Sequence, residues 1–476
     1  MVLREHRRRP RWRRRQPPGR VHECDDLRVP RARTRTWGAA MKNVLATLLL
    51  ATAAFAAQAA DVSTVDAALA RAQQAHQPVF IDFTAPWCYS CYFMASHVLN
   101  GAEWAALKRR AVTVEVDADS PDGAAWMKKL EVKALPAYVV LDEHGKERGR
   151  ILAEQPRAKF YPMLDAILAG AGTLDDYRAK AQAGDAEAAR TVLASYQARG
   201  DGKGGLDWYA TLPATLRAKL ERDERATLLR DRLALQRART DKDDAAAVAA
   251  AQRVLAGDPG CERLYVVMDL LGASEAMPKA EREPILRAQK PALDALLARD
   301  VFVASPTCAD QRSAVFASAE LAAALGDAAG EKAALDRGIA ATRAALGDDI
   351  GKDRNAADNL RVYLTMAKRT AELDALFPKL IAAYPDDYVY PYRWGRSLLE
   401  RGDAAKALPL LEQAAEKAYG VNRLTVAKLR VDALSALGRA DEAKSVASEV
   451  LELNGAWFPQ QSAELRKAAG IGEASH

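Results

Sequence analysis

Strand-like segments are confined to one short part of this chain of 476 residues. Four segments of apolar and β-branched residues carry the strand pattern: 79–83, 111–116, 137–141 and 147–152. After Gly170-Ala171-Gly172 the pattern vanishes, and Ala, Leu, Arg and Glu dominate up to the C-terminus. The fold must therefore change class near residue 170, from a mixed α/β domain to an all-α region.

Helical spacing of apolar residues surrounds the strand segments. Helices are expected at 63–77, at 88–99 and at 124–130. Turn residues at 142–146 separate the last two strands, which should therefore form a hairpin. Together these elements predict a compact α/β domain over residues 61–169.

The region from 173 to 476 has the pattern of short helices separated by Gly-Asp turns. Gly402 and Gly438 lie 36 positions apart, close to the roughly 34 residues of a tetratricopeptide repeat. We expect a helical-repeat, tetratricopeptide-like domain with its clearest repeats at 356–452. The pattern is weak between 207 and 349, and an irregular helical bundle without repeats is the alternative.

The positive charge of the chain is concentrated at its beginning. The total is +6, but residues 1–40 alone hold 13 Arg and 4 acidic residues, which leaves −3 for residues 41–476. A body with net negative charge gives no support for nucleic-acid binding.

A complete secretory signal pattern begins at Met41. A basic start, an apolar run and small residues ending at Ala59-Ala60 predict a signal peptide over 41–60, and hence a periplasmic protein. A membrane anchor is the alternative, but the run is shorter than the ~20 apolar residues of a membrane span. Residues 1–40 then either precede the true start of translation or form a disordered Arg-rich extension.

Cys88 and Cys91 are separated by two residues and directly follow a strand-like segment. At a helix start, unpaired backbone N–H groups and the helix dipole favour the thiolate of Cys88 over its thiol, which makes it a nucleophile. Cys91, one turn further along, would release a partner captured by Cys88. The pair predicts thiol-disulfide exchange.

Three other readings of the two cysteines are weaker. A structural zinc site needs two further ligands at suitable spacing, and c-type haem attachment needs His at position 92, which is Tyr. An inert structural disulfide would close a very short loop and so stabilise little. We therefore expect neither a metal nor another cofactor.

The stretch 78–91 resembles the active-site region of the thioredoxin family. Residues 130–137 look like the segment that carries the cis-proline of that family. In its sequence pattern, and above all in the spacing from Cys91 to Pro136, the chain most resembles the C-terminal periplasmic domain of thiol:disulfide interchange reductases of the DsbD family. The resemblance covers about residues 61–169 and implies a thioredoxin-like fold.

The resemblance implies a role for several residues. Cys88 matches the attacking cysteine and Cys91 the resolving one. Asp82 matches a buried carboxylate that assists proton removal from the resolving cysteine, and burial would raise its pKa. A solvated carboxylate at a strand edge is the alternative for Asp82.

The resemblance also implies a substrate-binding surface. Pro136 matches the cis-proline, and the backbone of Leu135 would pair with an incoming peptide; an ordinary trans turn is the alternative. Trp87 and Tyr89 are expected to contact substrate as well. The Tyr-Ser dipeptide between the cysteines and Thr84 depart from the pattern of common thioredoxins, so the reduction potential is not assigned.

Two further cysteines, Cys261 and Cys308, each follow turn residues in the helical part. In an exported protein we expect a structural disulfide between them, with free buried thiols as the alternative.

The sequence thus predicts an extracytoplasmic thiol-disulfide oxidoreductase, with reduction favoured only by the resemblance. Its expected partners are protein thiols and disulfides, a membrane-bound electron donor, and a protein bound by the helical repeats. The rival hypothesis is a helical-repeat scaffold or adaptor in which the first domain is a redox-inactive docking module.

Overall fold

The computed structural model describes residues 62–170 and 172–472. The predicted signal peptide at 41–60 and the Arg-rich residues 1–40 lie outside this range. We refer to residues 62–170 as the α/β domain and to residues 172–472 as the helical region.

The α/β domain is built on a four-stranded sheet with the order β2-β1-β3-β4. The first two strands pair in parallel and the other neighbours are antiparallel. The strands are β1 (Val79–Thr84), β2 (Val112–Asp117), β3 (Ala137–Leu141) and β4 (Glu147–Leu152). All four predicted strands, including the hairpin β3-β4, are present.

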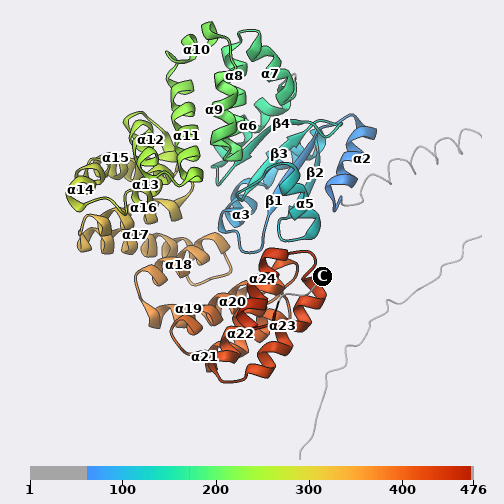
Figure 1. The fold of residues 1–476 in the computed structure, drawn as a ribbon, viewed down its shortest axis with the longest axis vertical. Coiled ribbons are helices and arrows are strands. Elements are labelled where there is room, and N and C mark those ends of the chain that lie inside the picture. The colour runs from blue at the N-terminus through green and yellow to red at the C-terminus, as the bar shows by residue number, and fades with distance from the viewer. Residues whose placement is uncertain (1–61, 171, 473–476) are drawn as a thin grey trace, which may run out of the picture. The chain divides into compact units, whose positions relative to one another are not determined.

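Helices cover both faces of the sheet (Figure 1). The helical elements of this domain are α2 (Val65–Ala75), α3 (Tyr89–Phe93), the π-helical turn η2 (Met94–Val98), α4 (Gly101–Arg110), α5 (Pro121–Lys129) and α6 (Arg157–Ala169). Because side chains alternate along a strand, Ile81 faces the core formed with α2 and α5, whereas Phe80 faces the core formed with η2, α4 and α6. Helix α4 was not predicted from the sequence.

Every element described after residue 170 is helical (Figure 1). The helices are α7 (Leu174–Gln182), α8 (Ala186–Arg199), α9 (Gly202–Ala210), α10 (Ala214–Leu220), α11 (Glu224–Asp241), α12 (Asp244–Ala256), η3 (Gly260–Glu262), α13 (Arg263–Ala273), α14 (Lys279–Arg287), α15 (Lys290–Leu296), η4 (Leu297–Val301), α16 (Gln311–Ala324), α17 (Ala328–Leu346), α18 (Arg354–Met366), α19 (Thr370–Ala383), α20 (Val389–Glu400), α21 (Ala404–Ala415), α22 (Val421–Ala436), α23 (Ala440–Asn454) and α24 (Pro459–Ala469). The predicted change from an α/β domain to an all-α region is confirmed.

Consecutive helices pack as pairs near the C-terminus. Helices α20 and α21 lie so close that a Cβ atom on Gly395 would come within 2.8 Å of Leu411 Cγ. A small residue is therefore required at this crossing, as the repeat pattern assumes. That these pairs form tetratricopeptide-like repeats stays a prediction.

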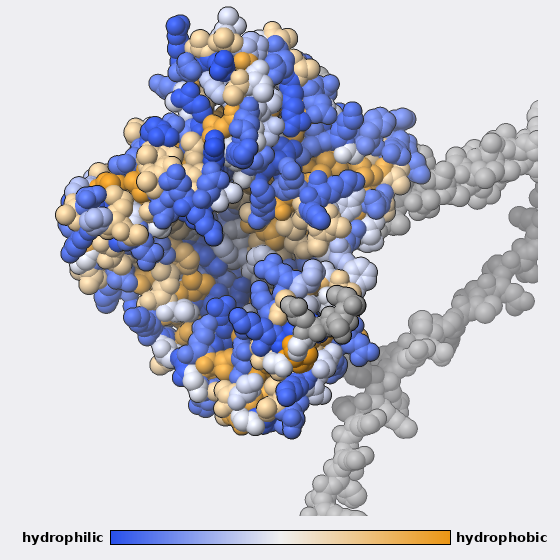
Figure 2. All heavy atoms as spheres, in the orientation of Figure 1, coloured by the Kyte–Doolittle hydropathy of each residue, from blue (hydrophilic) through white to orange (hydrophobic). Residues whose placement is uncertain are grey.

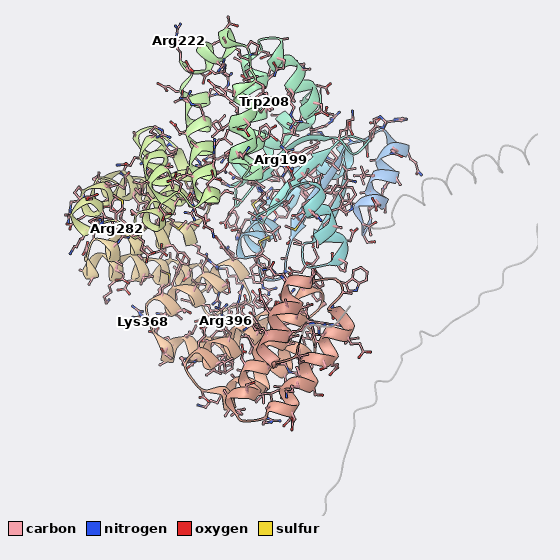
Figure 3. All side chains as sticks on the ribbon, in the orientation of Figure 1. Arg199, Trp208, Arg222, Arg282, Lys368 and Arg396 are labelled. Atoms are coloured by element: carbon pink, nitrogen blue, oxygen red, sulfur yellow. A yellow bond between two sulfur atoms is a disulfide. The ribbon has the colours of Figure 1, made fainter. Side chains whose placement is uncertain are left out.

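The helical region contacts the α/β domain at several places. Arg199 of α8 lies beside the sheet (Figure 3) and its Nη2 is 2.6 Å from Glu147 of β4. Farther along the chain, the Asn422 side chain at the start of α22 donates a hydrogen bond of 2.9 Å to Asp119, in the loop after β2. The two parts therefore meet at both ends of the helical region.

Hydrophilic residues cover most of the molecular face seen in Figure 2, with hydrophobic residues scattered between them. Trp87, at 41% exposure, is among the few large apolar side chains that stay open to solvent. Within the described residues, none of the helices combines the length and the apolar character that a membrane crossing requires.

The close approach of α22 to the loop after β2 generates a stability prediction. Gly420 has φ +53°, and a Cβ atom there would lie 2.1 Å from the Asp119 carbonyl oxygen. We expect Gly420→Ala to lower the free energy of unfolding by about 2–4 kcal/mol, because the cost of a left-handed backbone at alanine adds to the cost of a steric clash. Urea unfolding followed by circular dichroism measures this loss.

Gly438→Ala is the matched control. Gly438 also has positive φ, +74°, but nothing lies within 4 Å of its Cβ position. Its substitution should cost only the backbone strain, about 1 kcal/mol. Equal losses in the two variants would contradict the close contact at Gly420.

Candidate active site

The Cys88–Cys91 pair begins the helix that follows β1. A Thr-Ala-Pro segment breaks β1, and Cys88 then caps α3, its Sγ accepting a hydrogen bond of 3.1 Å from the backbone N–H of Cys91. The two cysteines form a disulfide, with Cα atoms 5.2 Å apart. The sulfur of Cys88 thus sits where a helix start offers free N–H groups to a negative charge.

The segment around Pro136 lies against the disulfide. The Leu135–Pro136 peptide bond is cis. Leu135 packs against the small apolar cluster formed by Ala85, Cys88 and Cys91. The structure therefore brings together the two segments that the family resemblance singled out, although they are more than 40 residues apart.

Asp82 lies on β1, beside Glu115 of β2 and Tyr138 of β3. Loss of hydration in this packed position raises the pKa of Asp82 to about 8, and the charge of Glu115 adds to the effect. A small part of the residue stays accessible, yet its carboxyl group is surrounded by protein. Asp82 therefore gains or loses a proton near neutral pH.

The helical region covers the loop that carries the cysteines. Asn355 Nδ2 donates a hydrogen bond of 2.8 Å to the backbone oxygen of Tyr89, and Arg393 Nη2 donates one of 2.9 Å to that of Trp87. Cys88 is 4% exposed and Cys91 5%. The helical region therefore packs on the loop that carries two buried cysteines.

Tyr89 is held by the helical region. The guanidinium carbon of Arg312 lies 3.6 Å from the centre of the Tyr89 ring, a cation–π contact. The Tyr89 hydroxyl donates a hydrogen bond of 3.4 Å to Asp310, and burial raises the pKa of Tyr89 to about 12. Tyr89 is thus a contact between the two parts of the chain, and its expected role in substrate binding stays a prediction.

A buried carboxylate organises the part of the helical region that packs on the cysteine loop. We call this part, which includes Arg312, Asn355 and Arg393, the covering surface. Asp358 of α18 is fully buried and forms ion pairs with Arg312 at 2.6 Å, Arg361 at 2.8 Å and Arg393. Burial alone would raise the pKa of Asp358, but the three arginines hold it far below its usual value. Two of these arginines, Arg312 and Arg393, are the ones that contact the cysteine loop.

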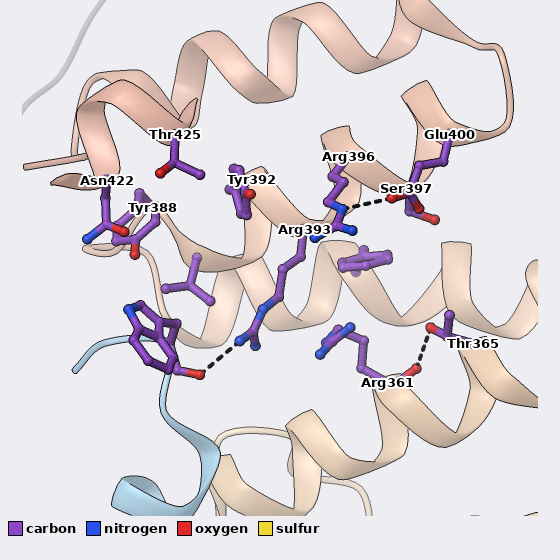
Figure 4. Close-up of a pocket in the computed structure, with 13 residues that line it drawn as sticks. Arg361, Thr365, Tyr388, Tyr392, Arg393, Arg396, Ser397, Glu400, Asn422 and Thr425 are labelled. Atoms are coloured by element: carbon purple, nitrogen blue, oxygen red, sulfur yellow. Dashed lines mark hydrogen bonds and ion pairs between the residues drawn. The ribbon is translucent and has the colours of Figure 1, made fainter. Parts of the chain in front are cut away.

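A cavity of about 450 Å³ opens beside Trp87. Figure 4 shows side chains of α18, α20 and α22 around it, with Arg361, Arg393 and Arg396 on its wall. The Trp87 indole Nε1 donates a hydrogen bond of 2.6 Å to Asp119, which fixes the ring at one end of the cavity. This cationic and aromatic cavity is lined by Trp87, the residue that directly precedes Cys88 in the chain.

A second carboxyl group lies near the cysteines. Glu154, which follows β4, is 6% exposed and hydrogen-bonds the side chain of Ser90, between the two cysteines. Burial, and then the charge of Asp310, raises the pKa of Glu154 well above its usual value. Glu154, like Asp82 on β1, is therefore hard to ionise.

Cys261 and Cys308 are joined by a disulfide in the helical region, with Cα atoms 5.3 Å apart. The bond links the turn η3 to the segment before α16. In the described part of the chain, no cluster of His, Cys, Asp and Glu side chains is arranged to hold a metal ion.

Sequence reasoning missed Glu154 of the α/β domain and the residues of the covering surface. Asn355, Asp358 and Asn359 follow one another at helical spacing and are buried in α18. Such a polar row on a buried helix face is a signal for a buried polar contact. The sequence alone does not reveal that its partner is the loop around Cys88, more than 260 residues away.

Comparisons with known proteins agree with this geometry. A family model described as "Thioredoxin-like domain" matches residues 65–168. The thiol:disulfide interchange protein DsbD of Neisseria meningitidis (serogroup A) is 31% identical over 105 residues, which are 21% of this chain and 18% of that protein. The chloroplastic thioredoxin-like protein HCF164 of Oryza sativa is 26% identical over 111 residues, 23% of this chain and 42% of that one.

Among solved structures, a thioredoxin from Thermus thermophilus is 29% identical, with a TM-score of 0.21, and the match covers 22% of this chain and 84% of that one. The chain covers less than a fifth of the length of the DsbD proteins that it matches. The predicted resemblance to the thioredoxin family is confirmed for the α/β domain.

The raised pKa of Asp82 gives a prediction about stability and pH. Between about pH 4 and pH 8 the folded protein keeps a proton that the unfolded chain has released, so Asp82 lowers stability as pH rises through this window. Relative to wild type, Asp82→Asn should gain about 3–4 kcal/mol of stability between pH 5 and pH 8, because each pH unit below the folded pKa is worth about 1.4 kcal/mol. Urea unfolding at the two pH values measures the gain.

The control for this prediction is Glu449→Gln, which removes an exposed carboxylate of α23. Its stability relative to wild type should not change between pH 5 and pH 8. If Asp82→Asn behaves in the same way, Asp82 does not carry the raised pKa.

Proposed function

Because residues 65–168 form a thioredoxin-like domain, we propose that the chain is a thiol-disulfide oxidoreductase that exchanges the Cys88–Cys91 pair with protein thiols and disulfides. The observation that carries the proposal is the disulfide at the start of α3, with the Leu135-Pro136 segment packed against it.

In the reducing direction, the Cys88 thiolate attacks a substrate disulfide. A mixed disulfide forms between Cys88 and the substrate, and the other substrate sulfur leaves as a thiolate that takes up a proton. Cys91 then loses its proton and attacks Cys88 Sγ, which releases the second substrate thiol and closes the Cys88–Cys91 disulfide. Two electrons and two protons pass to the substrate.

Asp82 is proposed to serve as the proton acceptor for Cys91. With a pKa of about 8, it exists in both protonation states near neutral pH, which suits a group that takes and returns a proton. Trp87 and Leu135 are proposed to contact the substrate, Trp87 from the cavity side and Leu135 from the side of the cis-proline.

We propose that the protein works outside the cytoplasm. The signal pattern at 41–60 supports export, and a mature chain beginning near residue 61 would contain the α/β domain and the helical region. Similarity to a thiol:disulfide interchange protein supports thiol-disulfide exchange. Reduction as the direction and a membrane-bound electron donor are proposed on the family resemblance alone. The helical region is proposed to bind a protein partner.

The burial of both cysteines bears on how substrates reach them. A folded protein cannot approach Cys88 while Asn355 and Arg393 bind the cysteine loop. The proposal therefore includes a transient opening between α18 and this loop. The same burial favours the rival function, a scaffold with a redox-inactive first domain, and turnover measurements separate the two.

The first test is insulin reduction by the purified mature protein with dithiothreitol as the electron source. Cys88→Ser should lower turnover at least a hundredfold, to the rate of dithiothreitol alone, because no other residue can replace the attacking thiolate. Ser96→Ala, on the exposed side of η2, should stay within about twofold of wild type. Equal turnover by Cys88→Ser and wild type would eliminate the enzymatic function.

The second test addresses the opening. Asn355→Ala removes a hydrogen bond to the Tyr89 carbonyl, worth about 1 kcal/mol, so the open state should become about fivefold more populated. The rate of insulin reduction should rise by a similar factor. Gln182→Ala, which removes a hydrogen bond between α7 and Thr211 within the helical region, is the control and should change nothing.

A further inference from the structure

The Cys261–Cys308 disulfide lies on the wall of a cavity of about 740 Å³. This cavity lies between the two parts of the chain, since Lys159 of the α/β domain lines it together with both cysteines. The two sulfurs differ in access, because Cys261 is partly exposed and Cys308 is 2% exposed. A reagent in the cavity can therefore reach one sulfur of the pair.

The ammonium group of Lys159 lies beside the partly exposed sulfur of Cys261. Lys159 Nζ lies 3.2 Å from Cys261 Sγ, and it comes from α6, about 100 residues away in the chain. A neighbouring ammonium group favours the thiolate form of a cysteine over the thiol and makes it a better nucleophile and leaving group. A purely structural disulfide gains nothing from such a contact.

The rest of the cavity wall has the same electrostatic character. Six of its lining residues are Lys or Arg and three are Asp or Glu. Arg150 and Arg199 pair with Glu147 and Arg232 pairs with Glu262, so the charge that attracts anionic molecules is smaller than this count and includes Lys159 itself. Ala134, next to the cis-proline segment, and Glu154, bonded to Ser90, line it too, so the cavity adjoins the Cys88–Cys91 site.

We propose that Cys261–Cys308 is a second thiol-disulfide exchange site, in which Cys261 is the reactive cysteine and Lys159 holds its thiolate. As in the first pair, one sulfur lies beside positive charge, but here that sulfur, Cys261, is partly exposed while Cys308 is buried. The substrate class is an anionic thiol, either a small molecule or a segment of a partner protein. This inference does not depend on the activity of Cys88–Cys91.

The exchange balances as follows. The thiolate of a first entering thiol attacks Cys261 Sγ, which forms a mixed disulfide and expels the Cys308 thiolate. A second thiolate attacks the sulfur of the first thiol and expels the Cys261 thiolate, which pairs with Lys159. The entering thiols leave as a disulfide, two electrons remain on Cys261 and Cys308, and the Cys308 thiolate takes up a proton released by the entering thiols.

The test uses the full mature protein carrying Cys88→Ser and Cys91→Ser, so that one disulfide remains to react. Reduced glutathione, an anionic thiol, is added under native conditions, and free thiols are then labelled with iodoacetamide and located by mass spectrometry. Circular dichroism records whether the fold persists. We expect the pair to open in the folded protein and Cys261 to be labelled at least tenfold faster than Cys308 at pH 7.

Lys159→Met in the same background tests the role of the cation. It should slow the labelling of Cys261 about three- to tenfold at pH 7, because less thiolate is present. Lys128→Met, at an exposed position of α5, is the matched control and should leave the rate unchanged. The outcome of the insulin assay on wild type does not enter this comparison.

Three results would overturn the proposal. The pair could open only when the fold is lost, which would leave it a structural link. Cys261 and Cys308 could be labelled at equal rates in the folded protein. Finally, Lys159→Met could match Lys128→Met, in which case the cation has no part in the chemistry.

Discussion

The buried charge of Asp358 underlies the contact between the two parts of this chain. Its carboxylate pairs with three arginines, two of which reach from the helical region to the loop that carries Cys88 and Cys91. Removal of one partner from a buried ion network costs about 3–5 kcal/mol, because the remaining charges stay buried without compensation. This carboxylate therefore helps to hold Arg312 against Tyr89 and Arg393 against Trp87, and Asn359 holds Arg312 as well.

This contact changes the surroundings of the disulfide. The cysteines are buried and their loop is bound by α18 and α20, and two carboxyl groups of the α/β domain are hard to ionise. Asp82 comes from β1, whereas Glu154 follows β4 and bonds to Ser90 between the cysteines. Where water is scarce, proton transfer depends on such side chains, so the covering surface shapes the chemistry as well as the access.

The α/β domain could be predicted closely from the sequence, because its strands are short apolar runs bounded by turn residues. Helix α4 was missed because Leu107 is its only buried residue, so it has no apolar stripe. The cysteine pair and Pro136 were found through a spacing shared with a known family. Asn355, Asp358 and Arg393 could not be found in this way, since they are polar residues of two distant helices, α18 and α20, and act through contacts that only the folded chain creates.

Cys88 is proposed to undergo thiol-disulfide exchange with other proteins although the helical region packs on its loop. Trapping with Cys91→Ala in cells that export the protein tests this claim most directly, since the captured partner cannot be released from Cys88. We expect adducts of higher mass that dithiothreitol reduces and that are missing when Cys88 is also replaced by Ser. An absence of adducts from Cys91→Ala, or equal adducts from the double variant, would contradict it.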